Sequence, residues 1–94
     1  MKITGIIWLD DIVDKLKQKH DIEPREVREV LDSHPWFRLV EKGHRSGENV
    51  YSAFGQTEAG RYLNVFFVYK RGRRALVISA RNMTQAERKT YERR

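Results

Sequence analysis

The side chains with the most distinctive chemistry are basic ones in the second half of the chain. Arg61 and Arg81 lie at the start of one predicted strand and at the end of another. The planar guanidinium group of arginine matches the oxygens of a phosphate, so we expect both residues to contact phosphate. A basic cluster surrounds one predicted turn, where it either binds phosphate or is simply solvated: Lys70, Arg71, Arg73 and Arg74.

The excess positive charge is confined to one half of the sequence. Residues 1–47 hold nine Lys/Arg and nine Asp/Glu, whereas residues 48–94 hold ten Lys/Arg and four Asp/Glu, which gives the whole net charge of +6. This asymmetry indicates a polyanionic partner: nucleic acid, an anionic membrane or an acidic protein. A basic surface that serves only solubility is the alternative.

The length and composition restrict the class of protein. A chain of 94 residues has room for one domain and one core, so residues 1–94 are expected to form a single domain. The chain has no cysteine, which excludes disulfides, thiolate metal sites and cysteine nucleophiles. No apolar stretch approaches the roughly 20 residues that cross a bilayer, and the start lacks the layout of a signal peptide. We therefore expect a cytoplasmic protein without membrane contact.

Hydrophobic periodicity predicts the elements that must position these side chains. Residues 10–20 and 24–32 have helical spacing, and a capping box at Thr84 and Glu87 begins a last helix. Alternation of apolar and polar residues predicts four strands, at residues 36–41, 49–54, 62–69 and 75–80. We expect an α+β fold with two N-terminal helices packed on a four-stranded antiparallel sheet, and with residues 62–69 as a central strand. Its core side chains are expected to be Leu63, Val65 and Phe67, or their alternates.

The order and spacing of several motifs resemble the BrnT family across nearly the whole chain. In the second half they are Gly47-Glu48 before a strand with Tyr51, then Gly55, Gly60-Arg61, Arg71-Gly72, Ile78-Ser79-Ala80-Arg81 and Glu87 to Tyr91. In the first half they are Trp8, Lys19-His20 and Val30-Leu31-Asp32. The resemblance implies a RelE-like fold, metal-independent cleavage of RNA as a toxin that inhibits translation, and inhibition by a cognate BrnA-like antitoxin.

Two positions depart from the pattern of the family. The sequence has Asn49 and Val50 where the family commonly has an arginine after the Gly-Glu pair, and Asp21 where a glycine usually follows Lys-His. The first departure indicates catalysis that is weaker than in the family or organised differently. It keeps open a second class of function, a non-catalytic nucleic-acid-binding module or inactive toxin relic.

Cleavage of RNA without a metal needs a base, an acid and cations that stabilise the phosphate. Arg61 and Arg81 are the candidate catalytic cations, and Glu48, His44 and His20 are the candidate bases, since arginine stays protonated. Glu48 is the first choice, with simple solvent exposure as its alternative, and His44 is also expected to bind RNA. His20 is favoured instead as a cap at the C-terminus of the first helix. Tyr91 either stacks on a base and assists proton transfer or anchors the last helix to the core.

No cofactor or metal is expected from the residue types. Asp10, Asp11 and Asp14 begin a predicted helix, where backbone amides favour carboxylates, so they do not indicate a metal site. The expected partners are RNA and the antitoxin, which could assemble into a higher-order complex with the basic half as its docking surface. A third alternative is a structural adaptor that binds an acidic protein.

Overall fold

The computed structural model describes residues 1–45 and 48–94, which form a mixed α+β fold with three helices and one five-stranded sheet. The elements in chain order are β1 (Gly5–Ile7), α1 (Asp10–His20), α2 (Pro24–Asp32), β2 (Trp36–Glu41), β3 (Val50–Gln56), β4 (Tyr62–Lys70), β5 (Arg74–Asn82) and α3 (Gln85–Arg93). No helix in these residues is long and apolar enough to span a membrane.

Strands β2 to β5 form the predicted antiparallel meander, and β4 lies in the middle of the sheet. The prediction of four strands in an all-antiparallel sheet is wrong, because β1 adds a fifth strand parallel to β5, with Ile6 opposite Ala75. Three residues are too few to show an alternating pattern, so periodicity gives no signal there. Thr4 secures this strand through its backbone N–H, which donates to the carbonyl of Arg73 at 2.8 Å.

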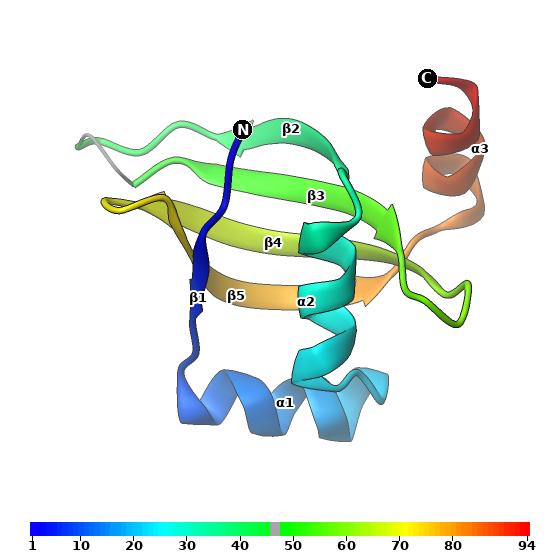
Figure 1. The fold of residues 1–94 in the computed structure, drawn as a ribbon, viewed down its shortest axis with the longest axis horizontal. Helices are drawn as coiled ribbons and strands as arrows, with labels where there is room; N and C mark the ends of the chain where they lie inside the picture. The colour runs from blue at the N-terminus through cyan, green and yellow to red at the C-terminus, as the bar shows by residue number, and fades with distance from the viewer. Residues whose placement is uncertain (46–47) are drawn as a thin grey trace.

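The hydrophobic core is formed by residues of the sheet and of the first two helices. Figure 1 shows α2 crossing in front of the sheet. The predicted set of Leu63, Val65 and Phe67 on β4 is confirmed, since all three side chains are fully buried. They pack against a face of α2 that includes Val27 and Val30. Because neighbouring residues of a strand point to opposite sides of the sheet, the alternate residues of β4 lie on the other face.

The turn between α1 and α2 contains one of the two departures from the pattern of the family. Asp21 follows α1 with φ of 52°, in the left-handed region; its N–H donates to the carbonyl of Lys17, and the N–H of Ile22 donates to the carbonyl of Leu16. Glycine takes this conformation without steric cost, which explains why the position favours it. The Asp21 carboxylate pairs with Lys17 at 3.4 Å, but both side chains are exposed, so the pair adds little stability.

We expect Asp21→Gly to raise the free energy of unfolding by up to about 1 kcal/mol, because it relieves the left-handed conformation. The larger entropy of glycine in the unfolded chain offsets part of the gain. Chemical denaturation of both proteins measures the difference. Gln18→Gly, in the exposed interior of α1, is the matched control and should lower stability by about 1 kcal/mol. A loss of stability in Asp21→Gly would contradict this account.

Helix α3 stands apart from the other two helices, at the end of the sheet where β3 finishes and β4 begins (Figure 1). Its predicted capping box is confirmed: the Glu87 N–H donates to Thr84 Oγ1 at 3.1 Å, and the Thr84 N–H donates to Glu87 Oε1 at 2.9 Å. No residue of α3 is buried. The β2–β3 loop and the β4–β5 hairpin lie at the opposite end of the sheet.

Candidate functional site

Arg81 lies near the end of β5, on the sheet face that α1 and α2 do not cover. It is opposite Asn64 of β4, which alternates with the core residues Leu63 and Val65. We call this side the open face; its residues used below are Arg38, Ser52, Phe54, Asn64, Phe66 and Arg81. The guanidinium of Arg81 lies 5.4 Å from the centre of the Phe66 ring. The aromatic ring and the neighbouring strands therefore fix the direction of the side chain.

The charge of Arg81 is paired with Glu87 in the first turn of α3. Arg81 Nη1 and Nη2 donate to the two carboxylate oxygens at 2.7 and 2.9 Å. This pairing, helped by the backbone amide of Thr84 and the side chain of Asn64 and opposed by burial, lowers the pKa of Glu87 from 4.5 to about 2. The same hydrogen bonds raise the pKa of Arg81. Glu87 is thus a carboxylate at neutral pH, and it cannot act as an effective base while Arg81 holds it.

The lowered pKa of Glu87 predicts a specific loss of stability in acid. A carboxyl whose pKa is lower in the folded state contributes its full stabilisation at pH values above the pKa of the unfolded state, near 4.5. This contribution disappears as the pH falls through the folded-state pKa of about 2. Thermal unfolding of the parent and of Glu87→Gln between pH 7 and pH 2 tests this. Glutamine still completes the capping box, so the variant isolates the charge. We expect the stability difference between the two proteins to shrink as the pH falls; a constant difference would refute the linkage.

Arg81 lines a cavity on the open face with a volume of about 280 Å³. Its other charged or polar residues are Arg38 on β2, Ser52 on β3, Asn64 on β4, and Glu87. Ser52 and Asn64 are buried, whereas Arg38 is exposed and has no carboxylate partner among the described residues. The volume is near the lower end of the ~300–1,000 Å³ typical of ligand sites, so the cavity has room for part of a nucleotide.

Arg38 is not among the residues predicted for the site, although the sequence contains a signal for it. Arg38 is opposite Ser52, and its neighbour Phe37 packs on the core with its ring 5.9 Å from that of Phe67. Strand alternation therefore directs Arg38 to the open face. A basic residue at an alternate position of a predicted strand, with apolar neighbours, could have been recognised as pointing toward Arg81.

Arg61 lies away from this cavity, on the side of the first two helices. Its guanidinium donates to the carbonyls of His20 and Asp21 at 2.7 Å each, and Nη1 lies 3.3 Å from both carboxylate oxygens of Glu26. Nε donates to Asn82 Oδ1 at 2.9 Å. The structure does not bring Arg61 and Arg81 together. Arg61 connects α1, α2 and β5, and its catalytic role stays a prediction.

The predicted residues of the β2–β3 loop and of the β4–β5 hairpin lie at the other end of the sheet (Figure 1). Glu48 and His44 are exposed loop residues, and Glu48 precedes β3; Gly47 lies outside the described residues. Val68, the partner of Val50, is four positions along β4 from Asn64, which corresponds to about 13 Å along the strand. Glu48 and His44 therefore do not join Arg81 in one cavity.

The basic turn cluster forms the predicted hairpin between β4 and β5. Gly72 and Arg73 have φ of 75° and 58°, which allows the chain to reverse in a tight turn. Arg71, Arg73 and Arg74 are exposed and Lys70 is partly exposed. Their exposure leaves them available to a phosphate backbone, and whether they bind it stays a prediction.

Tyr91 and His20 also lie outside the cavity. Tyr91 packs edge-on against Tyr62, with ring centres 6.0 Å apart, and so contributes to holding α3 on β4. Its side chain remains partly exposed, so its role on RNA stays a prediction. His20 ends α1, on the side of Arg61. Among the described residues, none of the three candidate bases lines the cavity with Arg81.

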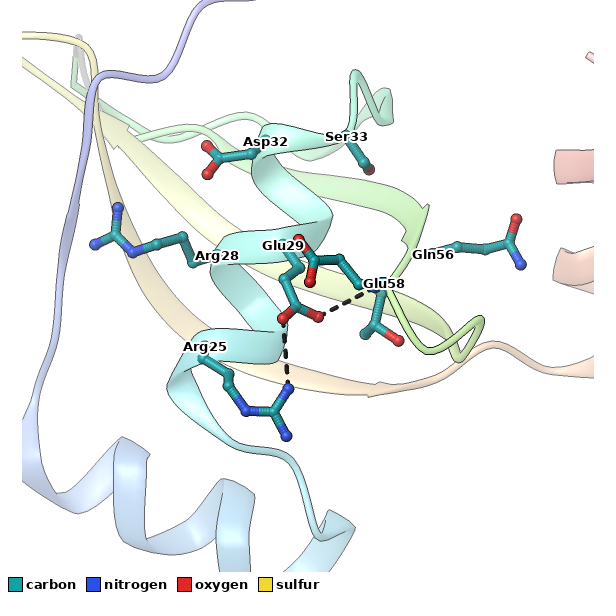
Figure 2. A pocket seen from close by; sticks show the side chains of 8 residues that line it. Arg25, Arg28, Glu29, Asp32, Ser33, Gln56 and Glu58 are labelled. Atoms are coloured by element: carbon teal, nitrogen blue, oxygen red, sulfur yellow. Dashed lines mark hydrogen bonds and ion pairs between the residues drawn. The ribbon is translucent and has the colours of Figure 1, made fainter.

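A larger cavity, of about 510 Å³, lies between α2 and the end of β3, but its chemistry suits RNA poorly. Figure 2 shows Glu29 joined both to Arg25 and to the backbone N–H of Glu58. The carboxylates of Asp32 and Glu58 also line it. Three carboxylates repel phosphate and offset the two arginines present, Arg25 and Arg28. We therefore place the candidate site on the open face. Among the described residues, no group of three or more His, Cys, Asp or Glu side chains could hold a metal ion.

Comparison with known proteins covers most of the chain. None of the curated proteins matches the chain. The family model described as the ribonuclease toxin BrnT of type II toxin–antitoxin systems matches residues 8–87. The match begins after β1 and ends at Glu87 in the first turn of α3, so it includes strands β2 to β5, both N-terminal helices and the Arg81–Glu87 pair. The resemblance found in the motifs is confirmed, and the chain belongs to the BrnT family of ribonuclease toxins.

Proposed function

We propose that this chain is an endoribonuclease that cleaves RNA at the open-face cavity and needs no metal ion for the reaction. One observation carries the proposal: Arg38 and Arg81 line a single cavity whose uncharged polar side chains, Ser52 and Asn64, are buried, and whose Glu87 carboxylate is paired with Arg81. Arginines can supply the cationic stabilisation that a metal provides in other nucleases. The aromatic ring of Phe66 beside Arg81 offers a surface for a base.

The reaction that suits such a site is an internal transfer of the phosphate. The ribose 2′-oxygen bonds to the adjacent phosphorus and loses its proton to a base or to water. The bond to the 5′-oxygen breaks, and that oxygen takes up a proton, which leaves a 2′,3′-cyclic phosphate and a 5′-hydroxyl. Arg81 is the proposed stabiliser of the negative charge that develops on the phosphate oxygens. To take this role, the phosphate has to replace Glu87 as the partner of Arg81.

The other basic residues are proposed to bind more distant parts of the RNA. Lys70, Arg71, Arg73 and Arg74 lie at the hairpin end of the sheet, and His44 lies in the neighbouring loop. Charges at this end would attract the backbone and give binding a strong dependence on salt. Glu48, His44 and His20 stay candidate bases, Tyr91 stays a candidate for base stacking, and Arg61 stays a candidate catalytic residue.

A cognate antitoxin, similar to BrnA, is the proposed protein partner. We propose that an acidic segment of this antitoxin covers the open face and the basic hairpin, so that one contact blocks both RNA attraction and catalysis. The complex would act in the cytoplasm, where its RNA substrates are, and could assemble to a higher order. A mapped complex that leaves Arg38 and Arg81 accessible would show that the inhibition is not by direct covering.

Two measurements test the proposed function. The first is cleavage of RNA by the purified chain with EDTA present: cleavage should continue, and its loss with recovery on adding a divalent ion would contradict metal independence. The second is expression of the gene with and without the neighbouring open reading frame, scored by growth and by RNA integrity. We expect growth inhibition and RNA loss only when the chain is expressed alone.

A second candidate function is the binding of nucleic acid without cleavage. One observation favours it: among the described residues, the only carboxylate that lines the cavity, Glu87, is paired with Arg81, and no histidine lines it. Binding without any cleavage under saturating protein would select this function.

A further inference from the structure

Asn64 is a buried polar residue of the open face whose chemistry the proposed reaction does not use. It lies in the middle of β4 with 1% of its surface exposed, between Phe54 on β3 and Arg81 on β5. Its Nδ2 donates to Glu87 Oε2 at 3.3 Å. Its Oδ1 has no hydrogen-bond partner within residues 1–45 and 48–94. A buried acceptor without a partner is unfavourable and uncommon in native proteins, so it requires an explanation.

The orientation of this amide is fixed by the carboxylate beside it. Exchanging the oxygen and nitrogen of Asn64 would bring Oδ1 to 3.3 Å from Glu87 Oε2, where two acceptors repel each other. The orientation with Nδ2 on Glu87 is therefore favoured, and it leaves Oδ1 as a free acceptor. Asn64 also lines the cavity of Arg38 and Arg81. The residue that carries this buried free acceptor therefore lines the cavity in which the two cations lie.

The two cations and the acceptor together define the ligand that the cavity would recognise. Arg38 and Arg81 offer only donors, which suits a phosphate, whereas Asn64 Oδ1 requires a donor close to that phosphate. A nucleotide of RNA carries both, because a 2′-hydroxyl or an exocyclic amine of the base can donate next to the phosphate. A phosphate alone would leave Oδ1 unpaired.

We propose that Asn64 Oδ1 accepts a hydrogen bond from a donor group of the nucleotide whose phosphate Arg38 and Arg81 hold. Asn64 is then a specificity-determining residue of the site, and it discriminates nucleotides by the presence of this donor. The inference rests on the proposed function, because it places RNA in the same cavity. It also predicts that RNA affinity depends on this donor group, which a cleavage assay alone does not measure.

The experiment measures the affinity of the intact chain and of Asn64→Leu for short oligonucleotides, by stopped-flow fluorescence before cleavage proceeds. Three probes of one sequence are compared. The first is RNA, and the second is 2′-fluoro RNA, which lacks the ribose donor. The third is RNA in which inosine and purine riboside replace guanosine and adenosine, so that the exocyclic amines of these bases are absent. We expect the parent to bind RNA roughly five- to tenfold more tightly than the analogue that lacks the relevant donor. Asn64→Leu should bind that analogue and RNA equally.

The two sources of the donor are separated by which analogue binds weakly: the 2′-fluoro RNA indicates the ribose hydroxyl, and the inosine RNA indicates the base amine. Arg73→Ala is the control, since it should weaken binding of all three probes by the same factor. Equal affinity of the parent for all three probes overturns the proposal without any variant, even if Asn64→Leu fails to fold. If the parent still cleaves RNA in that case, the proposed function stands and only the role of Asn64 is lost. Absence of both RNA binding and cleavage overturns both.

Discussion

Arg61→Ala is expected to lower the free energy of unfolding by about 3 kcal/mol or more. The guanidinium contacts acceptors from three separate elements: two carbonyls at the end of α1, the Glu26 carboxylate in α2 and the Asn82 side chain in β5. The carbonyls that end a helix lack partners within it, and removing one member of a buried ion pair leaves the other uncompensated. The pair is largely buried, with 28% of the Arg61 side chain and 12% of the Glu26 side chain exposed.

Chemical denaturation measures this effect, and Arg25→Ala provides the matched control. Arg25 also pairs with a glutamate of α2, Glu29, at 3.4 Å, but its side chain is 70% exposed. Its removal should cost about 0.5 kcal/mol or less. A domain of this size has a total stability of roughly 5–15 kcal/mol, so the loss at Arg61 should also be visible as a lower Tm. Equal stabilities of the two variants would show that Arg61 does not connect the helices to the sheet.

The same variant also tests the predicted catalytic role of Arg61. At a temperature where Arg61→Ala remains folded, an unchanged rate of RNA cleavage under saturating protein would assign Arg61 to stability alone. A loss of rate in folded protein would support the catalytic prediction, despite the distance of Arg61 from the cavity residues. The folded fraction has to be measured in the same buffer, because a partly unfolded sample contains less active protein and therefore has a lower apparent rate.

The sequence predicted the long elements well because their periodicity is repeated several times. The helix at Asp10–His20 and the strand at Trp36–Glu41 have the predicted bounds, and the pattern of β4 identified its buried face. β1 was missed because three residues carry no period, and its pairing with β5 depends on contacts about seventy residues away in sequence. The local sequence pattern carries no information on contacts between residues that are so far apart in the chain.

The candidate site was only partly predictable, for a related reason. Arg81 and the Thr84–Glu87 capping box were recognised separately, but the box alone does not show that Glu87 also holds Arg81. Arg61 seemed equivalent to Arg81 because the two have the same side chain at strand ends. What separates them is the side of the sheet to which each points, and the two carbonyls that Arg61 contacts lie about forty residues earlier in the chain.

Arg81→Ala is expected to reduce the rate of RNA cleavage by roughly 10²–10³ under saturating protein, by analogy with the loss of a fixed donor to a transition-state oxyanion. The physical reason is placement: Arg81 is held by the β5 backbone, by the Phe66 ring and by Glu87, so a phosphate meets a cation whose position is already set. Removing it also leaves Glu87 without its main partner and costs stability. The double variant Arg81→Ala/Glu87→Gln removes that unpaired charge, and it should be equally slow.

Arg73→Ala is the comparison that separates catalysis from binding. Arg73 is exposed in the hairpin, so its loss should weaken RNA affinity and reduce the dependence of binding on salt, while the rate at saturation stays near that of the parent. Single-turnover cleavage, measured beside affinity at several salt concentrations, distinguishes the two variants. If folded Arg81→Ala cleaves at the parent rate, Arg81 only organises α3 or binds RNA. The cleavage chemistry would then have to lie elsewhere, with the loop that carries Glu48 and His44 as the next place to examine.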